Sequence, residues 1–164
     1  HGFPLVRRVV TVTGSCVREP GNLMVPIGTL VSDIIEACGG TRIPPKKVII
    51  GGPMMGIAQY TCDIPVTKGT SGILLLSENE VFLEEPLPCI RCGKCVEACP
   101  MNLVPLWIAG YAEASRFDDS ERLGALDCIE CGCCSFICPS RRRLVQGIRL
   151  AKAEIRARRN AKRG

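Results

Sequence analysis

The first half of the chain alternates short runs of β-branched and apolar residues with glycine-rich turns. Four of these runs predict strands, at residues 7–13, 23–25, 47–50 and 73–76. A helix is expected over residues 30–37, with Thr29 as its cap and Gly39 and Gly40 at its end. Two strands, one helix and then returning strands is the order of a β-grasp domain, which we predict for residues 1–77. It has too few helices for a doubly wound nucleotide-binding fold.

The second half of the chain has helical periodicity instead. Apolar spacing predicts helices over residues 104–114 and 117–126. In the first helix we expect Trp107 to be a core residue. The inward-facing positions predicted beside it are Leu106, Ile108, Ala109 and Ala112.

The C-terminal segment predicts a third, amphipathic helix, because its apolar residues recur at helical intervals. These residues are Leu144, Ile148, Ala151 and Ile155. Between the two halves, residues 78–88 carry two prolines and four glutamates, which indicates an exposed linker; the glutamates are Glu78, Glu80, Glu84 and Glu85. The predicted fold class is therefore α+β, a small β-grasp domain followed by an all-helical domain at residues 89–164.

The composition indicates that cross-links support the structure. The 164 residues include 12 cysteines but only seven aromatic side chains, which limits the size of any apolar core. No stretch approaches the roughly 18–20 consecutive apolar residues of a membrane span. The first residues, His1-Gly2-Phe3-Pro4, have neither an initiator methionine nor the order of a signal peptide, which favours a processed or excised fragment.

Eight of the cysteines form two copies of one pattern, Cys-x2-Cys-x2-Cys-x3-Cys-Pro. Three cysteines at intervals of three can reach three corners of an iron–sulfur cube, and in the bacterial pattern the fourth ligates the other cube. We therefore predict two [4Fe–4S] clusters. The first is assigned to Cys89, Cys92, Cys95 and Cys138, and the second to Cys128, Cys131, Cys134 and Cys99.

Glycines and prolines stand at equivalent places in the two runs. Gly93 and Gly132 are expected to let the backbone wrap closely and aim N–H groups at sulfur. Pro100 and Pro139 are expected to redirect the chain after each fourth cysteine.

Zinc sites and a disulfide framework are the alternatives to iron–sulfur clusters. Zinc sites normally use two Cys-x2-Cys pairs without the third cysteine and the Cys-Pro, so duplicated four-cysteine runs disfavour both alternatives.

The other cysteines, Cys16, Cys38, Cys62 and Cys133, are expected to be reduced thiols, with Cys133 facing away from the cube or serving as a neighbouring sulfur. Free thiols beside cluster ligands indicate the reducing cytoplasm.

The glycine-rich segment 51–56 follows a predicted strand but matches neither the dinucleotide fingerprint nor the P-loop. We interpret it as a tight turn whose Met54 and Met55 pack on the core or on a neighbouring domain; a ligand-contacting loop is the alternative. His1 is the only histidine, and residues 1–77 show no catalytic constellation. No complete active site is predicted, and the expected role is electron transfer.

The two cysteine runs and their surroundings resemble the C subunit of the Rnf membrane complexes. The segments that carry the resemblance are CIRCGKCVEACP, DCIECGCCSFICPS and LVQGIRLAKAEI in the second half and VIIGGPMMG and DIPVTKGTSGILLLS in the first. The first half is similar to the soluble ligand-binding β-grasp (SLBB) domain of that protein. One departure is Arg143, where the resemblance implies a proline before Leu144.

This resemblance implies a part of an ion-translocating NADH:ferredoxin oxidoreductase that passes single electrons through its two clusters. It further implies an N-terminal domain, missing here, that binds FMN and handles NADH, and other Rnf subunits as partners at the cytoplasmic face of the membrane. A flavin-linked cobalamin reductase has a similar domain order and is one alternative. A zinc-stabilised interaction module is the other.

Charge is concentrated at the C-terminus. Residues 141–164 contain ten basic residues and one acid, whereas residues 1–140 contain 11 basic and 15 acidic residues. This basic tail is expected to be solvated, or to dock on an anionic membrane surface or on acidic partner subunits. Aromatic stacking residues are missing from it, so nucleic-acid binding is not predicted.

Overall fold

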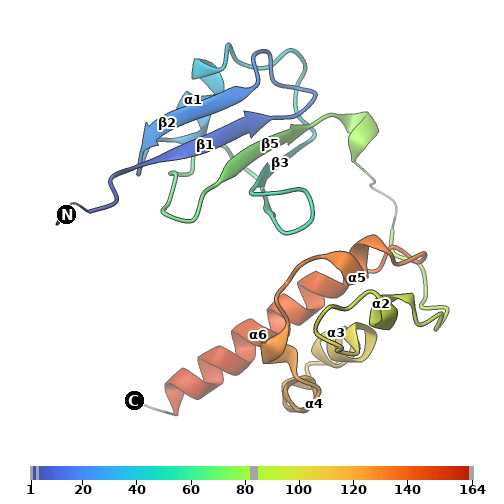
Figure 1. Ribbon diagram of the computed structural model, residues 1–164. Helices are drawn as coiled ribbons and strands as arrows, with labels where there is room; N and C mark the ends of the chain where they lie inside the picture. The colour runs from blue at the N-terminus through green and yellow to red at the C-terminus, as the bar shows by residue number, and fades with distance from the viewer. Residues whose placement is uncertain (1, 3, 82–84, 163–164) are drawn as a thin grey trace. The chain divides into compact units, whose positions relative to one another are not determined.

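The computed structural model describes residues 2, 4–81 and 85–162, and the chain divides into two compact units, residues 1–83 and 84–164. In Figure 1 the first unit is coloured blue to green and the second yellow-green to red. The first contains the sheet and the second contains most of the helices, so the chain is of the mixed α+β class, as predicted.

The first unit is built on a five-stranded sheet with the strand order β2-β1-β5-β3-β4. Strands β1 and β5 are parallel, and the other neighbouring pairs are antiparallel. The strands are β1 Arg7–Thr13, β2 Gly21–Pro26, β3 Lys47–Ile50, β4 Ile57–Gln59 and β5 Gly72–Leu76. The predicted strands are thus found, and β4 is additional.

One face of this sheet is covered by helix α1, Val31–Ala37. Strand β1 shows why, since its residues alternate between the two faces and only Val10 and Val12 point into the core. Ile34 and Ile35 of α1 belong to the same core. The common core is apolar and includes the buried thiols of Cys16 and Cys38.

The predicted cap of α1 is wrong. Leu30 occupies the N-cap position, and the Thr29 hydroxyl donates a 2.9 Å hydrogen bond to the carbonyl oxygen of Pro26 instead. That bond closes the turn before the helix. The end of the helix agrees with the prediction, because Gly39 and Gly40 have φ values of 75° and 76° that favour glycine.

The turn at residues 51–56 excludes one of the two positions predicted for its methionines, the core of their own unit. Met54 and Met55 are 42% and 55% exposed, so they do not pack on the core of their own unit. Gly56 is the constrained position, since a Cβ there would lie 2.4 Å from the Ile49 side chain. The turn therefore brings backbone, and not methionine side chains, against the sheet.

The start of the predicted linker is tied to the first unit. Residues Glu78–Glu80 form a 3₁₀ turn, η1. The Glu80 carboxylate accepts hydrogen bonds from the N–H and hydroxyl of Ser77, each 2.8 Å long, and from the Ser15 hydroxyl. These bonds lower the pKa of Glu80. Glu84 lies outside the described residues.

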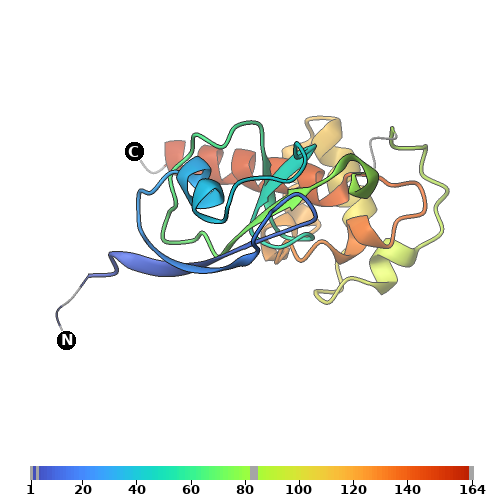
Figure 2. The same ribbon diagram turned by 90° about the horizontal axis from the view of Figure 1, so that it is seen from above.

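The second unit is helical over its described residues. Its helices are α2 Lys94–Glu97, α3 Pro105–Glu113, α4 Phe117–Arg122, α5 Cys133–Phe136 and α6 Leu144–Ala161, with a 3₁₀ turn, η2, at Ala125–Asp127. The predicted helix over residues 117–126 is interrupted at Gly124, whose φ is 79°. Helices α3 and α4 lie beside the long α6 in both views (Figures 1 and 2).

The contact between α3 and α6 forms the core of this unit. The four predicted apolar positions of α6 are all buried, as are three of those predicted in α3: Ile108, Ala109 and Ala112. The helices approach closely at Gly147, where a Cβ would lie 3.0 Å from the Cβ of Ala109. The prediction for Trp107 is wrong, because this side chain is 51% exposed and lies beside Tyr111.

Candidate metal centres

The two cysteine motifs follow the same backbone path, 39 residues apart. The residue before the second cysteine is left-handed in both, with φ values of 54° at Arg91 and 57° at Glu130. This conformation lets each N–H donate a 3.4 Å hydrogen bond to the first sulfur of its motif, from Arg91 to Cys89 and from Glu130 to Cys128. Such bonds stabilise negative charge on a thiolate.

The glycines of the motifs also have a role at the starts of two short helices. Gly93 and Gly132, with φ values of 79° and 86°, are the N-cap residues of α2 and α5. The left-handed backbone favours glycine there, since it turns the chain into the short helix that carries the third cysteine.

The chain also leaves both motifs in the same way. Asn102 and Arg141 are equivalent and left-handed, with φ values of 53° and 50°. Helix α3 then begins at Pro105 and α6 begins at the equivalent Leu144. The unexpected Arg143 therefore leaves the path unchanged, and its counterpart in the first motif is Val104.

Each motif contributes three cysteines to one cavity and its fourth to the other. The first cavity is lined by four cysteines and by apolar residues that include Leu106 and Leu144; the cysteines are Cys89, Cys92, Cys95 and Cys138. The second is lined by Leu103, Val145 and Ile148, among others, and by Cys99, Cys128, Cys131 and Cys134. These are the two sets that the sequence pattern pairs. A third N–H, from Leu103, donates a 3.4 Å hydrogen bond to the Cys99 sulfur.

The two cavities differ in exposure. Cys89 and Cys92 are exposed, whereas their equivalents Cys128 and Cys131 are partly buried. Burial raises the pKa of the Cys95 and Cys128 thiols, and it raises that of Cys134 to about 11. Thiolates in such surroundings need a compensating positive charge, which the iron atoms of a cluster supply.

The arrangement of the cysteines suits a cluster. The four cysteines of each set line a cavity that is also lined by apolar residues. Four thiols, donor N–H groups and apolar walls are the surroundings that a [4Fe–4S] cluster requires.

A buried cation lies beside the second set and was not predicted. Lys152 of α6 is 6% exposed, and its Nζ lies 2.7 Å from the Cys128 carbonyl oxygen and 2.6 Å from Glu130 Oε1. Arg149 Nε is 2.8 Å from the other carboxylate oxygen of Glu130. Burial raises the pKa of Glu130, but the bonds from Lys152 and Arg149 outweigh it, so the pKa is lowered. Lys152 follows Ile148 by four residues, so helical spacing places it on the inner face.

The remaining four cysteines form no disulfide bond. Cys16 and Cys38 are buried in the first unit, and Cys62 packs against its core. Burial raises the pKa of Cys38 and Cys62. Cys133 hydrogen-bonds the side chain of Cys131, which raises the pKa of the Cys133 thiol and makes it the neighbouring sulfur of the second set.

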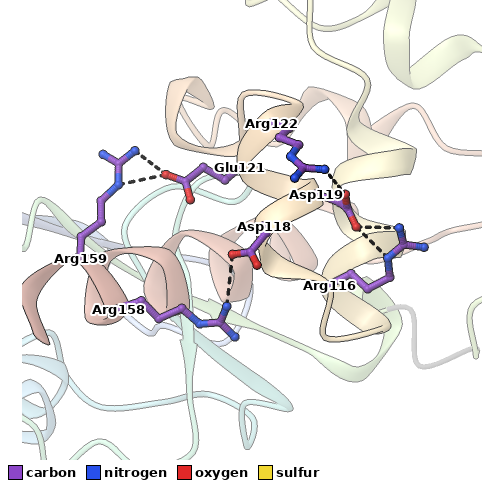
Figure 3. A network of polar contacts seen from close by, with 7 residues as sticks. All are labelled: Arg116, Asp118, Asp119, Glu121, Arg122, Arg158 and Arg159. Atoms are coloured by element: carbon purple, nitrogen blue, oxygen red, sulfur yellow. Dashed lines mark hydrogen bonds and ion pairs between the residues drawn. The ribbon is translucent and has the colours of Figure 1, made fainter. Parts of the chain in front are cut away.

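The basic tail is partly neutralised within its own unit. Near the end of α6, Arg158 pairs with Asp118 at 3.4 Å and Arg159 pairs with Glu121, both on α4 (Figure 3). Arg142 pairs with Glu113 at 2.6 Å. With Arg149 and Lys152, five basic residues of the described tail face acids. Arg163 lies outside the described residues.

Comparison with known proteins agrees with this division of the chain. Residues 9–58 match the SLBB domain family, and residues 82–139 match the 4Fe-4S dicluster domain family. None of the helices in the described part of the chain has the length and apolar character to cross a membrane.

Three relatives are similar over nearly the whole chain, and each is the C subunit of an oxidoreductase complex. That of the Na(+)-translocating ferredoxin:NAD(+) oxidoreductase complex of Acetobacterium woodii is 49% identical over 96% of this chain. That of the proton-translocating ferredoxin:NAD(+) oxidoreductase complex of Clostridium ljungdahlii is 46% identical over 96% of it, and that of the ion-translocating oxidoreductase complex of Rhodobacter capsulatus is 43% identical over 99%. The chain spans 36%, 35% and 31% of their respective lengths. It therefore belongs to the family of C subunits of the Rnf-type ion-translocating oxidoreductase complexes, of which it matches about a third, and it contains an SLBB domain and a 4Fe-4S dicluster domain.

Proposed function

We propose that this chain is the electron-transfer part of an Rnf-type NADH:ferredoxin oxidoreductase and carries two [4Fe–4S] clusters. One observation carries the proposal, the exchange of the fourth cysteine between two equivalent motifs, which gives each cavity four thiols. The first cluster is held by Cys89, Cys92, Cys95 and Cys138. The second is held by Cys128, Cys131, Cys134 and Cys99.

The protein's own part in the reaction is to bind the clusters and to adjust their reduction potentials. A bound cluster supplies one-electron transfer with little change of shape. The N–H groups of Arg91, Glu130 and Leu103 bond to sulfur and stabilise its negative charge. Apolar residues such as Leu106 and Ile148 exclude water from the cavities. No proton has to move, which agrees with a unit that contains no histidine.

The proposal also assigns a fold to each unit. The first unit is a β-grasp domain, supported by its parallel β1–β5 pair and a single helix on one face. The second is an all-helical dicluster domain, supported by five helices in its described residues. FMN and NADH are handled by a further, N-terminal domain of the whole protein, as the greater length of the relatives permits.

We place the chain at the cytoplasmic face of the membrane, in contact with the flavin domain and with other subunits. The four cysteines outside the two ligand sets form no disulfide bond, which supports a reducing compartment. Peripheral membrane contact is assigned to the basic tail, in which five cations also face acids of their own unit.

Metal analysis and electron paramagnetic resonance (EPR) of the reduced protein test the proposal. Anaerobically purified chain is expected to be brown, to hold about eight iron atoms and to bleach with dithionite. A colourless protein with stoichiometric zinc after anaerobic reconstitution would contradict it and favour a zinc-stabilised interaction module.

A further inference from the structure

The two motifs share a backbone but not a charge pattern. The second has Glu130 in its loop and Arg149 and Lys152 on the following helix. Thirty-nine residues earlier, the equivalent positions are Arg91, Gly110 and Glu113. Among the residues that the structure describes, a buried lysine bonded to the backbone of a ligand cysteine therefore occurs in the second motif and not in the first.

The position of Lys152 connects its charge to the second cavity. Its Nζ lies 2.7 Å from the carbonyl oxygen of Cys128, one of the residues that line that cavity. Only 8% of the Lys152 side chain is exposed, so solvent screens its charge weakly. By contrast, Glu113, the equivalent residue of the first motif, is 55% exposed.

Glu130 opposes this cation from the same loop. Its N–H donates to the Cys128 sulfur, and its carboxylate lies between Lys152 and Arg149. Together, Lys152, Arg149 and Glu130 have a net charge of about +1 beside the second cluster. Neutralising any one of the three changes this charge by one unit. Reduction adds one negative charge to a cluster, so a nearby cation favours the reduced form and a nearby anion disfavours it.

We propose that the buried Lys152–Glu130 pair sets the reduction potential of the second cluster, with Lys152 raising the potential and Glu130 limiting the rise. This inference rests on the proposed function, because it needs a cluster at Cys99, Cys128, Cys131 and Cys134. Lys152 is a positioning residue, since it acts through the charge around the ligands and contacts no sulfur.

The test is an EPR-monitored redox titration of the anaerobically reconstituted 164-residue chain. Lys152→Met should make reduction of one cluster about tenfold less favourable, which is about 59 mV for a one-electron couple, and leave the other unchanged. Glu130→Gln should move the same couple in the opposite direction by a similar factor. Lys152→Arg, which keeps the charge, should restore most of the potential.

A remote charge on the same helix gives the matched control. Arg159→Met removes a cation that pairs with Glu121 on α4, and it should move neither couple. The couple that Lys152→Met shifts must also be the one lost with Cys99→Ser. A merely structural role for the pair predicts that both substitutions disturb the cluster in one direction, whereas an electrostatic role predicts opposite signs.

Each outcome supports or overturns the proposal. Shifts of the same sign, equal shifts of both couples, or no shift would overturn it while leaving two [4Fe–4S] signals in place. If Lys152→Met fails to hold the second cluster, Glu130→Gln decides, because an unchanged or lowered potential in that variant contradicts the proposal. A wild-type chain without two cluster signals would overturn the proposed function itself, and this inference with it.

Discussion

The two cysteine motifs have the same backbone conformation but different surroundings. Their left-handed residues, short helices and exit paths coincide at an interval of 39 residues. The first set is nevertheless more exposed, through Cys89 and Cys92, and the second lies beside a buried cation, Lys152. Ligation depends on the shared backbone, whereas the electrostatic surroundings depend on side chains that the duplication does not preserve.

Each motif gives its fourth cysteine to the other motif's cluster, and this exchange links the two motifs most strongly. Removing either of these cysteines should have the largest effect of the substitutions considered. Cys99→Ser should damage the cluster whose other ligands are in the second motif, and Cys138→Ser the cluster of the first. Each variant should keep about four of about eight iron atoms and lose a different EPR signal.

Iron analysis and EPR of both variants check this crossed arrangement. Loss of the same signal in the two variants, with the fold intact by circular dichroism, would contradict the pairing. The free thiol Cys62, in the first unit, provides the control, since Cys62→Ser should leave both signals intact.

The helices that follow the motifs differ in how much room their glycines have. A Cβ at Gly147 of α6 would lie 3.0 Å from the Ala109 Cβ and 3.2 Å from its Cα, whereas one at Gly110 of α3 meets no described atom within 4 Å. Gly147→Ala should therefore lower the free energy of unfolding by about 1–3 kcal/mol, because α3 and α6 must separate. Gly110→Ala should raise it by about 0.5–1 kcal/mol through helix propensity.

Denaturant unfolding of the two variants under anaerobic conditions measures this contrast. Equal effects of the two substitutions would show that close approach at Gly147 does not hold the two helices together.

The sequence predicted those features that produce a periodic or local pattern along the chain. The cysteine spacing identified the eight candidate ligands, and helical spacing identified the buried positions of α6, such as Ile148 and Ile155. Strands β1 and β3 were predicted at their observed bounds because β-branched runs are a local signal. Strand β4, only three residues long, has no such run and depends on pairing with β3.

The failures were at positions decided by tertiary contacts. Trp107 is large and apolar, yet its neighbours Ile108 and Ala109 fill the interface with α6 and leave it outside. Lys152 was counted as part of a basic tail, although its spacing from Ile148 places it inside. A charge count records sign and number, but only packing determines which charges are buried.

A single hydrogen bond distinguishes the starts of the two long helices. The N–H of Val145, in the first turn of α6, donates a 3.0 Å hydrogen bond to the hydroxyl of Ser135. The equivalent N–H in α3, that of Leu106, bonds to the Cys95 sulfur, and Val96 stands in place of the serine. Ser135→Ala should cost about 1 kcal/mol of stability, because an N–H at a helix start loses its acceptor.

Thermal unfolding of Ser135→Ala, beside Val96→Ala as the matched change in the first motif, tests this difference. Recovery with Ser135→Thr, which restores an acceptor, would assign the loss to the hydrogen bond. An unchanged Tm in Ser135→Ala would indicate that water replaces the hydroxyl.

The ion pairs at the end of α6 should have the smallest effect, although Figure 3 shows two of them beside a third charged group on α4. Arg158 and Asp118 are 49% and 80% exposed, so solvent and salt screen their attraction. Removing both arginines, as Arg158→Gln with Arg159→Gln, should lower the free energy of unfolding by at most about 1 kcal/mol. The loss should shrink further in 1 M salt, where the Debye length is about 3 Å. A larger, salt-independent loss, measured by denaturant titration at two salt concentrations, would show that the arginines hold this end of α6 by packing, for example of Arg158 over the Phe117 ring, and not by exposed ion pairs.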